Sequence, residues 1–510
     1  MTASTLSVSK ETLVQTVTAL DTAFEQPVEK DFVLPDYCPD VFRILKCRVT
    51  PQVISHSING GRLTVDTQAV IKVMYLAENS GRINLLEQKM TFSKAIDLTA
   101  GCVSPSVSAC ARLDYVNCRV VNQRRIDIRG AYSVKVRVSA ESRKQFVTSA
   151  EGAGIQLKTS QINFPSGRLC AAKRITLVEE LELGGAKPPV GSVLWSGCRI
   201  ERSEQRIVTG KLMIKGEASV ELVYTPADES ALSVETMRFS IPFSQVIDMD
   251  GLDESFTLSV KANAASCDII PRAEDASRLE CELVMLISCT AVRYSAGSAV
   301  TDAFSTRYEC ETSVCDQRVG AVPRECCAEF TRTGDLHYTD EALASIACAR
   351  CGTGNISVRR NEGRTVISGT LAMSAVGLSG SGCAVFLENE VPFELESDDC
   401  FSEDTEVTVK NCSYHLTDDH SVEIKAELAV TGEVTEQYGV FPLEELSVLT
   451  DRPLAGTGGY ALKLCFVEPG EDIWELAKRF RTSPRMITDE NELSSDRTER
   501  GGMLLIPLIN

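Results

Sequence analysis

The stretch Gly61-Arg-Leu-Thr-Val-Asp-Thr-Gln-Ala-Val-Ile-Lys-Val-Met-Tyr75 decides the fold of most of the chain, because it occurs more than once. It returns 149 residues later as Gly210-Lys-Leu-Met-Ile-Lys-Gly-Glu-Ala-Ser-Val-Glu-Leu-Val-Tyr224. A more divergent third copy begins 153 residues further on, at Gly363-Arg-Thr-Val-Ile. This repetition indicates three similar modules in series, each long enough to fold by itself.

Within each copy the apolar residues alternate with polar ones, as Leu63 and Val65 do in the first. A helix would need apolar residues spaced by three and four, whereas a spacing of two is typical of a β-strand with one buried face. The pair Gly60-Gly61 supplies a tight turn directly before the strand. The repeated stretch is therefore predicted to be a strand that follows a hairpin turn.

Other motifs keep the same order from copy to copy. Phe92-Ser-Lys-Ala-Ile-Asp97 matches Phe243-Ser-Gln-Val-Ile-Asp248, and a closing pair of strands follows, at 126–128 and 132–136 in the first copy. Many short strands separated by turns predict a mainly β fold, with three tandem antiparallel β-sandwich-like modules. A short helical or irregular piece is expected before each copy, ending at Ile44-Leu45, Val193-Leu194 and Ser345-Ile346.

The last fifty residues follow another pattern, with a strand ending at Val467, then a turn and a helix. Asp472 is suited to cap that helix, whose apolar positions recur at intervals of three and four. Thr482-Ser-Pro484 offers the start of a second helix, and a short strand closes the chain at 501–507. The tail is therefore predicted to be a small βααβ domain.

These patterns divide the chain into six parts. The glycines and the proline of Asp451-Arg-Pro-Leu-Ala-Gly-Thr-Gly-Gly459 are typical of a linker between the last repeat and the tail. The predicted parts are an N-terminal segment (1–27), β repeat 1 (28–150), β repeat 2 (165–300), β repeat 3 (301–450), the linker (451–459) and the small C-terminal domain (460–509).

The composition narrows the possible functions. With 71 acidic and 52 basic residues, the net charge is −19 and no basic run interrupts the acidic background. Phosphate backbones and anionic lipids repel such a surface, so neither nucleic acid nor a membrane is expected as a partner. The first twenty residues lack the basic start and apolar core of a signal peptide, and no long apolar run predicts a membrane span. We expect the protein to stay in the compartment that makes it.

Catalysis and metal binding are not expected. Many of the 20 cysteines lie in strand-like runs, where a small buried hydrophobic residue serves as well, so reduced thiols are expected rather than a disulfide framework. Cys348-Ala-Arg-Cys351 is the only CxxC, and no second pair completes a zinc spacing. The chain has 4 histidines and lacks nucleophile-elbow, phosphate-loop and HExxH motifs. We predict a protein that is not an enzyme and has no cofactor.

The tail resembles a LysM domain, the small module that binds peptidoglycan and chitin. Nine features of the LysM pattern recur in the right order, at Val467, Gly470, Ile473-Trp474, Leu476-Ala477, Phe480, Asn491, Leu493, Gly501 and Leu504 with Ile506-Pro507. The resemblance implies glycan binding. Glycan-binding members have Gly-Asp-Thr or Gly-Asp-Ser at the first turn, whereas this chain has Gly470-Glu471-Asp472, which adds charge and removes a hydroxyl. Contact with a protein therefore fits the tail better than contact with a sugar.

The repeats resemble β modules of endospore-forming bacteria whose hallmark is LPDxxPDxxRIL. Leu34-Pro-Asp-Tyr-Cys-Pro-Asp-Val-Phe-Arg-Ile-Leu45 fits that hallmark, while the second and third copies have lost most of it. Tandem modules of this kind with a terminal LysM are similar to the SipL-type spore coat morphogenetic proteins. That resemblance implies a scaffold on the mother-cell side of the forespore, at the spore coat, that binds a coat morphogenetic ATPase of the SpoIVA type. The alternative is a cell-wall protein that binds peptidoglycan or another glycan.

The candidate binding site lies in the tail. Leu464-Cys-Phe-Val467 is apolar on both faces, and the helices can cover the face with Cys465 and Val467, which leaves Leu464 and Phe466 in need of another cover. That cover is either a protein partner or the third repeat. The candidate partner-binding or glycan-binding residues are Phe466, Gly470, Glu471, Asp472, Ile473, Asn491, Arg500 and Gly501.

Overall fold

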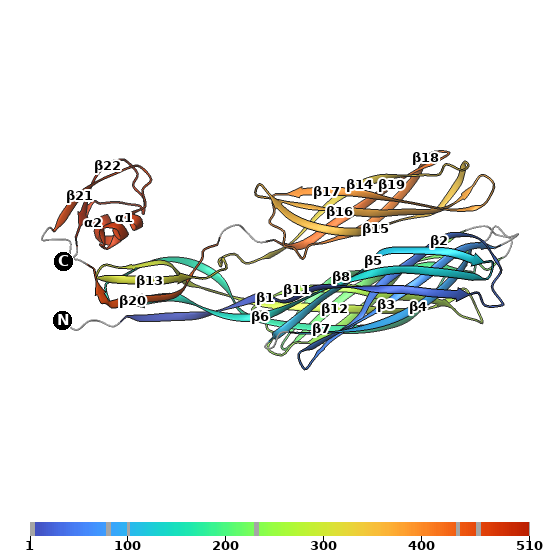
Figure 1. Ribbon diagram of the computed structural model, residues 1–510, viewed down its shortest axis with the longest axis horizontal. Helices are drawn as coiled ribbons and strands as arrows, with labels where there is room; N and C mark the ends of the chain where they lie inside the picture. Colours follow the sequence, from blue (N-terminus) through green and yellow to red (C-terminus); the bar gives the residue numbers. More distant parts are fainter. Residues whose placement is uncertain are drawn as a thin grey trace.

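The computed structural model describes residues 6–77, 83–98, 102–228, 234–434, 439–454 and 461–508. The molecule is elongated (Figure 1), with three β modules toward one end, a stalk of β-strands that leads to the other end, and a small unit with both helices beside the stalk. The described part of the chain begins and ends toward the stalk end (Figure 1). The predicted mainly β fold is confirmed.

Module 1 is a sandwich of two three-stranded antiparallel sheets, β1-β6-β5 and β2-β3-β4. The repeated stretch forms β3, the central strand of its sheet, and alternate residues such as Leu63, Val65 and Ile71 are buried against β6 of the other sheet. The two-residue turn at Gly60-Gly61 has positive φ at both glycines, as the sequence indicated. The strands are β1 (Ser7–Val33), β2 (Val41–Asn59), β3 (Arg62–Ala77), β4 (Ile83–Asp97), β5 (Val103–Asn122) and β6 (Arg125–Glu151).

Module 2 repeats this arrangement strand for strand, with sheets β11-β12-β7 and β10-β9-β8. Its central strand β9 is the second copy of the repeated stretch, and Leu212, Ile214 and Tyr224 are buried in the core between the sheets. The strands are β7 (Ile155–Glu182), β8 (Val190–Val208), β9 (Lys211–Pro226), β10 (Glu235–Asp248), β11 (Phe256–Pro271) and β12 (Arg278–Ser305).

Module 3 has the same two sheets, β14-β19-β18 and β15-β16-β17, but its two long strands are interrupted. The strand equivalent to β1 is divided into β13 and β14, and the strand equivalent to β6 into β19 and β20. The bounds are β13 (Tyr308–Val314), β14 (Arg324–His337), β15 (Leu343–Asn361), β16 (Arg364–Ser379), β17 (Ala384–Ser397), β18 (Glu406–Asp418), β19 (Ser421–Val434) and β20 (Leu443–Pro453).

The stalk consists of three two-stranded ribbons that extend from the modules. The ends of β1 with β6 and of β7 with β12 continue beyond the sandwiches, and β13 with β20 forms the third ribbon (Figure 1). Apolar side chains from the ribbons meet along the stalk, where the rings of Phe146 and Phe164 lie edge to face with centroids 5.0 Å apart. Val147, Val300 and Leu443, one from each ribbon, share a second cluster. Burial of these residues stabilises the stalk.

The structure corrects two local predictions. The expected helical or irregular pieces before each copy are wrong, because Ile44, Leu194 and Ile346 lie within β2, β8 and β15. The expected closing pair at 126–128 and 132–136 is one strand, β6, which continues through Gly130. The edge strand β5 approaches Gly130 closely, with Tyr115 O 2.5 Å from where a Cβ would stand. Glycine therefore marks close packing here and no turn.

Two predicted domain boundaries fall inside strands of the structure. The boundary at 27/28 falls inside β1, so the expected N-terminal segment is part of module 1 and its stalk ribbon. The first residues of the expected linker, Asp451 to Pro453, complete β20. Residues 455–459 of that linker lie outside the described residues.

The hallmark loop, residues 34–40, has a structural role in module 1. The Arg124 guanidinium donates hydrogen bonds to the backbone oxygens of Leu34 (3.2 Å), Pro35 (2.8 Å) and Cys38 (3.3 Å), and to Asp40 Oδ1 (2.7 Å). The hydroxyl of buried Tyr75 donates to Pro39 O. Module 2 keeps the second of these contacts, since Tyr224 donates to Pro188 O at 2.9 Å. Asp40 and the backbone oxygens of Pro35 and Pro39 thus fix the loop across one end of the sandwich.

The C-terminal unit has the predicted βααβ order. It consists of β21 (Leu462–Val467), α1 (Ile473–Phe480), α2 (Pro484–Glu490) and β22 (Gly502–Pro507), and the two strands pair antiparallel. Asp472 caps α1 as expected, accepting a hydrogen bond from the Trp474 backbone N–H at 2.8 Å. Its core includes Ile473, Leu476 and Ile506, all buried.

Candidate functional site: the two faces of the C-terminal unit

The helical face of the C-terminal unit packs on the stalk. The Trp474 ring meets the Phe304 ring of β12 edge to face, with centroids 5.0 Å apart and an angle of 67°. The Trp474 Nε1–H donates to Asp302 Oδ2 at 2.8 Å. Because a buried indole N–H needs an acceptor, one contact supplies both apolar burial and a charge-assisted hydrogen bond. Trp474 is therefore the centre of the docking contact.

Two ion pairs flank Trp474. Lys478 Nζ lies 2.7 Å from Asp302 Oδ2, and Lys158 Nζ of β7 lies 2.8 Å from Asp472 Oδ2. Burial by itself raises the pKa of both carboxyl groups, but the hydrogen bonds from Lys478 and Trp474 to Asp302, and from Lys158 and the Trp474 backbone to Asp472, outweigh it and lower both pKa values. Both aspartates are thus held in the charged form that the docked arrangement needs.

The sheet face of the unit points the other way and is apolar. Phe466 pairs with Met503 across β21 and β22, and Leu464 pairs with Leu505. The opposite face carries Val467, which is buried among the helices, as the LysM resemblance implied. We call the outward side chains the apolar face; its most exposed members are Leu462 (48%), Leu464 (61%), Phe466 (68%) and Met503 (57%).

The structure separates the predicted site residues into three groups. Phe466 lies on the apolar face. The turn with Gly470, Glu471 and Asp472 lies at the start of α1, where Asp472 contacts the stalk. Gly470 has a φ of +89°, which a side chain rarely adopts, so glycine is required by the turn. Exposed Arg500 lies just before β22, two residues after Thr498, whose backbone oxygen accepts a hydrogen bond from the Gly470 N–H of this turn.

Other members of the predicted set serve the fold. Ile473 is 2% exposed and belongs to the core of the unit. The Asn491 amide donates to the backbone oxygens of Ile487 (2.8 Å) and Leu505 (2.6 Å) and accepts from the Leu505 N–H, so it ties α2 to β22. A Cβ on Gly501 would lie 3.4 Å from both Pro469 Cδ and Val467 O. The binding roles of these residues remain predictions.

The stalk contacts were not predicted. Packing against the third repeat was considered for the apolar face, whereas it is the helical face that packs, and it does so on β7 and β12 of module 2. Lys158, Asp302 and Phe304 carried no signal in the sequence, because nothing there relates them to a tail that follows Asp302 by 172 residues and Lys158 by 314 residues.

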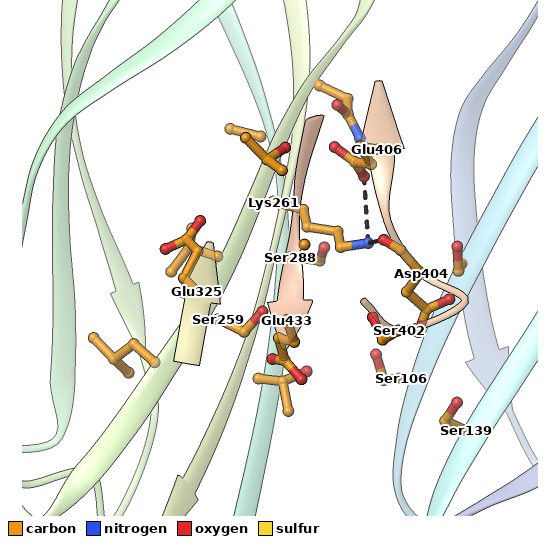
Figure 2. A pocket seen from close by; sticks show the side chains of 18 of the residues that line it. Ser106, Ser139, Ser259, Lys261, Ser288, Glu325, Ser402, Asp404, Glu406 and Glu433 are labelled. Carbon is orange, nitrogen blue, oxygen red and sulfur yellow. Dashed lines mark hydrogen bonds and ion pairs between the residues drawn. The ribbon is translucent and has the colours of Figure 1, made fainter. Parts of the chain in front are cut away.

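A large cavity of about 2190 Å³ lies between the three modules. Its lining combines serine hydroxyls with charges of both signs, and Figure 2 shows Lys261 of module 2 beside Asp404 and Glu406 of module 3. Lys261 Nζ lies 3.3 Å from Glu406 Oε1 and 3.2 Å from the Asp404 backbone oxygen. Charges paired in this way join one module to another.

Neither a metal centre nor a membrane helix stands out within the described ranges. Among these residues no group of three or more His, Cys, Asp or Glu side chains is placed to hold a metal ion. No helix in this part of the chain is long and apolar enough to cross a bilayer.

The architecture defines a class of protein: β sandwiches in tandem, with a small βααβ unit at the end. Residues 40–121 and 189–270 each match the family model "SipL, SPOCS domain". The two matches cover corresponding parts of the fold, β2 to β5 in module 1 and β8 to β11 in module 2. They support the resemblance to SipL-type proteins and link the chain to sporulation. No curated protein and no solved structure matches the chain.

Proposed function

We propose that the protein is a non-catalytic scaffold of spore coat assembly, located on the mother-cell side of the forespore surface. In this proposal the C-terminal unit acts as a LysM-like module and binds a coat morphogenetic ATPase of the SpoIVA type. The two SPOCS-domain matches support a role in sporulation. The nature of the partner rests on the resemblance to the SipL-type proteins.

The observation that carries the proposal is the apolar face. Leu464, Phe466 and Met503 project from one side of a two-stranded sheet, and all three are mostly exposed. Protein interfaces favour aromatic and aliphatic anchors of this kind, surrounded by polar residues. Exposed Glu468 supplies a polar neighbour directly after this strand. This face is open while the helical face is docked on the stalk, so a partner can bind without undocking the unit.

Glycan binding is the less favoured alternative. The turn from Gly470 to Asp472, where the LysM resemblance places the sugar, is in part held against the stalk by the Lys158 contact. Glu471 adds a further negative charge to that turn. A sugar would therefore compete with the stalk for Asp472 and meet a charged rim.

The test compares capture of a SpoIVA-type ATPase by the full chain and by Phe466→Glu and Leu464→Glu variants. Both variants should lose capture, because a buried, unpaired charge at an interface is costly. Val178→Glu is the matched control, since Val178 is an exposed valine on a strand of module 2 and should tolerate the charge. Circular dichroism verifies that all variants fold.

Two outcomes would redirect the assignment. Capture that survives complete removal of residues 460–510 would move the contact to the β modules. Sedimentation of the full chain with purified peptidoglycan, lost on removal of the same residues, would favour the glycan alternative.

A further inference from the structure

Modules 1 and 3 each contain two thiols in contact between their facing sheets. In module 3, Cys351 Sγ of β15 lies 3.2 Å from Cys412 Sγ of β18. In module 1, the Cys47 thiol of β2 and the Cys118 thiol of β5 hydrogen-bond each other. All four strands are edge strands of their sheets. Each pair therefore joins the two sheets along the side on which the sandwich is open.

The two pairs occupy related but different positions. Counted along the paired strands, Val49 and Val116 of module 1 correspond to Cys351 and Cys412 of module 3. Both thiols of module 1 are displaced by two residues from those positions, toward the same end of the sandwich, so that they still meet. If each cysteine served only as a small hydrophobic residue, the two positions would not have to shift together between modules. What the two modules share is the pairing of thiols and not the position.

Module 2 also brings thiols together at this place. Cys198 of β8 and Cys267 of β11 correspond to the pair of module 3. Cys267 also contacts Cys281 of the neighbouring strand β12, and Cys198 lies close enough to both thiols to influence the pKa of Cys267. The same side of the sandwich thus holds at least two neighbouring thiols in every module.

We propose that the Cys351–Cys412 and Cys47–Cys118 pairs are modification sites. At each site a low-molecular-weight disulfide oxidises the two thiols to a disulfide that joins the two sheets of the module. In the first step a thiolate of the pair attacks the small disulfide, forming a mixed disulfide and releasing one small thiol. The partner thiol then attacks the mixed disulfide, loses its proton and releases the second small thiol. Two protein thiols and one small disulfide give one protein disulfide and two small thiols, so electrons and protons balance.

Exposure in module 1 and thiol acidity in both modules identify the first nucleophile. Cys118 and Cys412 are partly exposed, so a small reagent reaches both. The hydrogen bond from Cys351 lowers the pKa of Cys412 and raises that of Cys351, and Cys47 does the same for Cys118. Since the thiolate is the attacking species, Cys118 and Cys412 take the first step. Their partners, buried Cys47 and partly exposed Cys351, complete the bond.

The experiment treats the purified full chain with oxidised glutathione, blocks the remaining thiols in acid and denaturant, and maps the peptides by mass spectrometry. We expect intrachain links between Cys351 and Cys412 and between Cys47 and Cys118, which disappear with dithiothreitol. The oxidised chain should melt at a higher temperature than the reduced chain, because a link between two sheets restricts the unfolded state. Peptides of the two pairs that remain unlinked, while exposed thiols carry glutathione, would overturn the proposal.

A variant tests the order of the two steps. Cys351→Ser removes the resolving thiol, so glutathione should remain attached to Cys412 and the link should be lost. Cys383→Ser is the matched control, because Cys383 is an exposed thiol outside the pairs, and it should leave the link unchanged. Absence of glutathione at Cys412 in the Cys351→Ser variant would contradict the assignment of Cys412 as first nucleophile.

Discussion

The two faces of the C-terminal unit differ in what covers them. The helical face packs on the stalk through Trp474, Lys478 and Asp472, a contact that combines an aromatic pair with charged hydrogen bonds. The sheet face exposes Leu464 and Phe466 to solvent. Position in the unit, and not hydrophobicity, therefore separates the residues that hold the molecule together from those that stay exposed.

The largest effect is expected in the core that lies between the two faces. Leu476 is 4% exposed and packs among both helices and the strands, so Leu476→Ala should reduce the free energy of unfolding of the unit by about 2 to 5 kcal/mol. A domain of this size has little stability in reserve. Denaturant unfolding, monitored by hydrogen exchange of the α1 amides, measures the loss of unfolding free energy.

The control for this variant lies on the open face. Leu462→Ala removes the same atoms from a side chain that is about half exposed and should cost far less. Equal losses at Leu462 and Leu476 would show that the sheet face is covered in solution.

A smaller effect is expected at the docked face. Trp474→Phe keeps an aromatic ring against Phe304 but removes the donor to Asp302, and hydrogen bonds to charged groups contribute about 1.5 to 3 kcal/mol. Hydrogen exchange of α1 should therefore become faster in the full chain. An Asp302→Asn variant should show a similar change. No change in either variant would mean that the unit does not dock through this contact.

The sequence predicted the strands inside the modules better than the parts of the strands that form the stalk. The β3 and β9 strands followed from alternation and from a glycine turn, both of which are local signals. The stalk part of β1 has no regular alternation, and Leu13 is buried only because two other ribbons pack beside it. Likewise, the LysM pattern placed Cys465 and Val467 inward, whereas docking on Phe304 depends on a residue of module 2. Local patterns predict elements, and tertiary contacts determine where the elements go.

Acid should weaken the docked face and leave the open face unchanged. The pKa values of Asp302 and Asp472 are lowered in the folded protein. Their contribution is therefore fully present above the pKa of an unperturbed aspartate, about 3.9, and is lost as the pH falls from there through the lowered values. Near pH 7 a change of one pH unit should have no effect on docking.

The emission of Trp474, measured in a Trp195→Phe background, follows this transition because the chain has 2 tryptophans. The emission should shift to longer wavelength below about pH 4, since protonated aspartates release the indole to water. Asp302→Asn should reduce the part of the wavelength shift that depends on pH, because it removes one of the two titrating groups. A shift centred near neutral pH would assign the docking to other residues.

The smallest effect on stability is expected on the apolar face itself. Phe466 is 68% exposed, and a surface substitution away from caps and cores usually changes stability by less than about 0.5 kcal/mol, so Phe466→Ser should unfold at nearly the same denaturant concentration as the parent chain. The same substitution removes the largest side chain of an exposed apolar cluster, and such clusters promote association. Self-association at high protein concentration, measured by sedimentation velocity, should therefore decrease although stability does not. A loss of stability comparable to that of Leu476→Ala would place Phe466 in a contact within the chain and remove the distinction between the two faces.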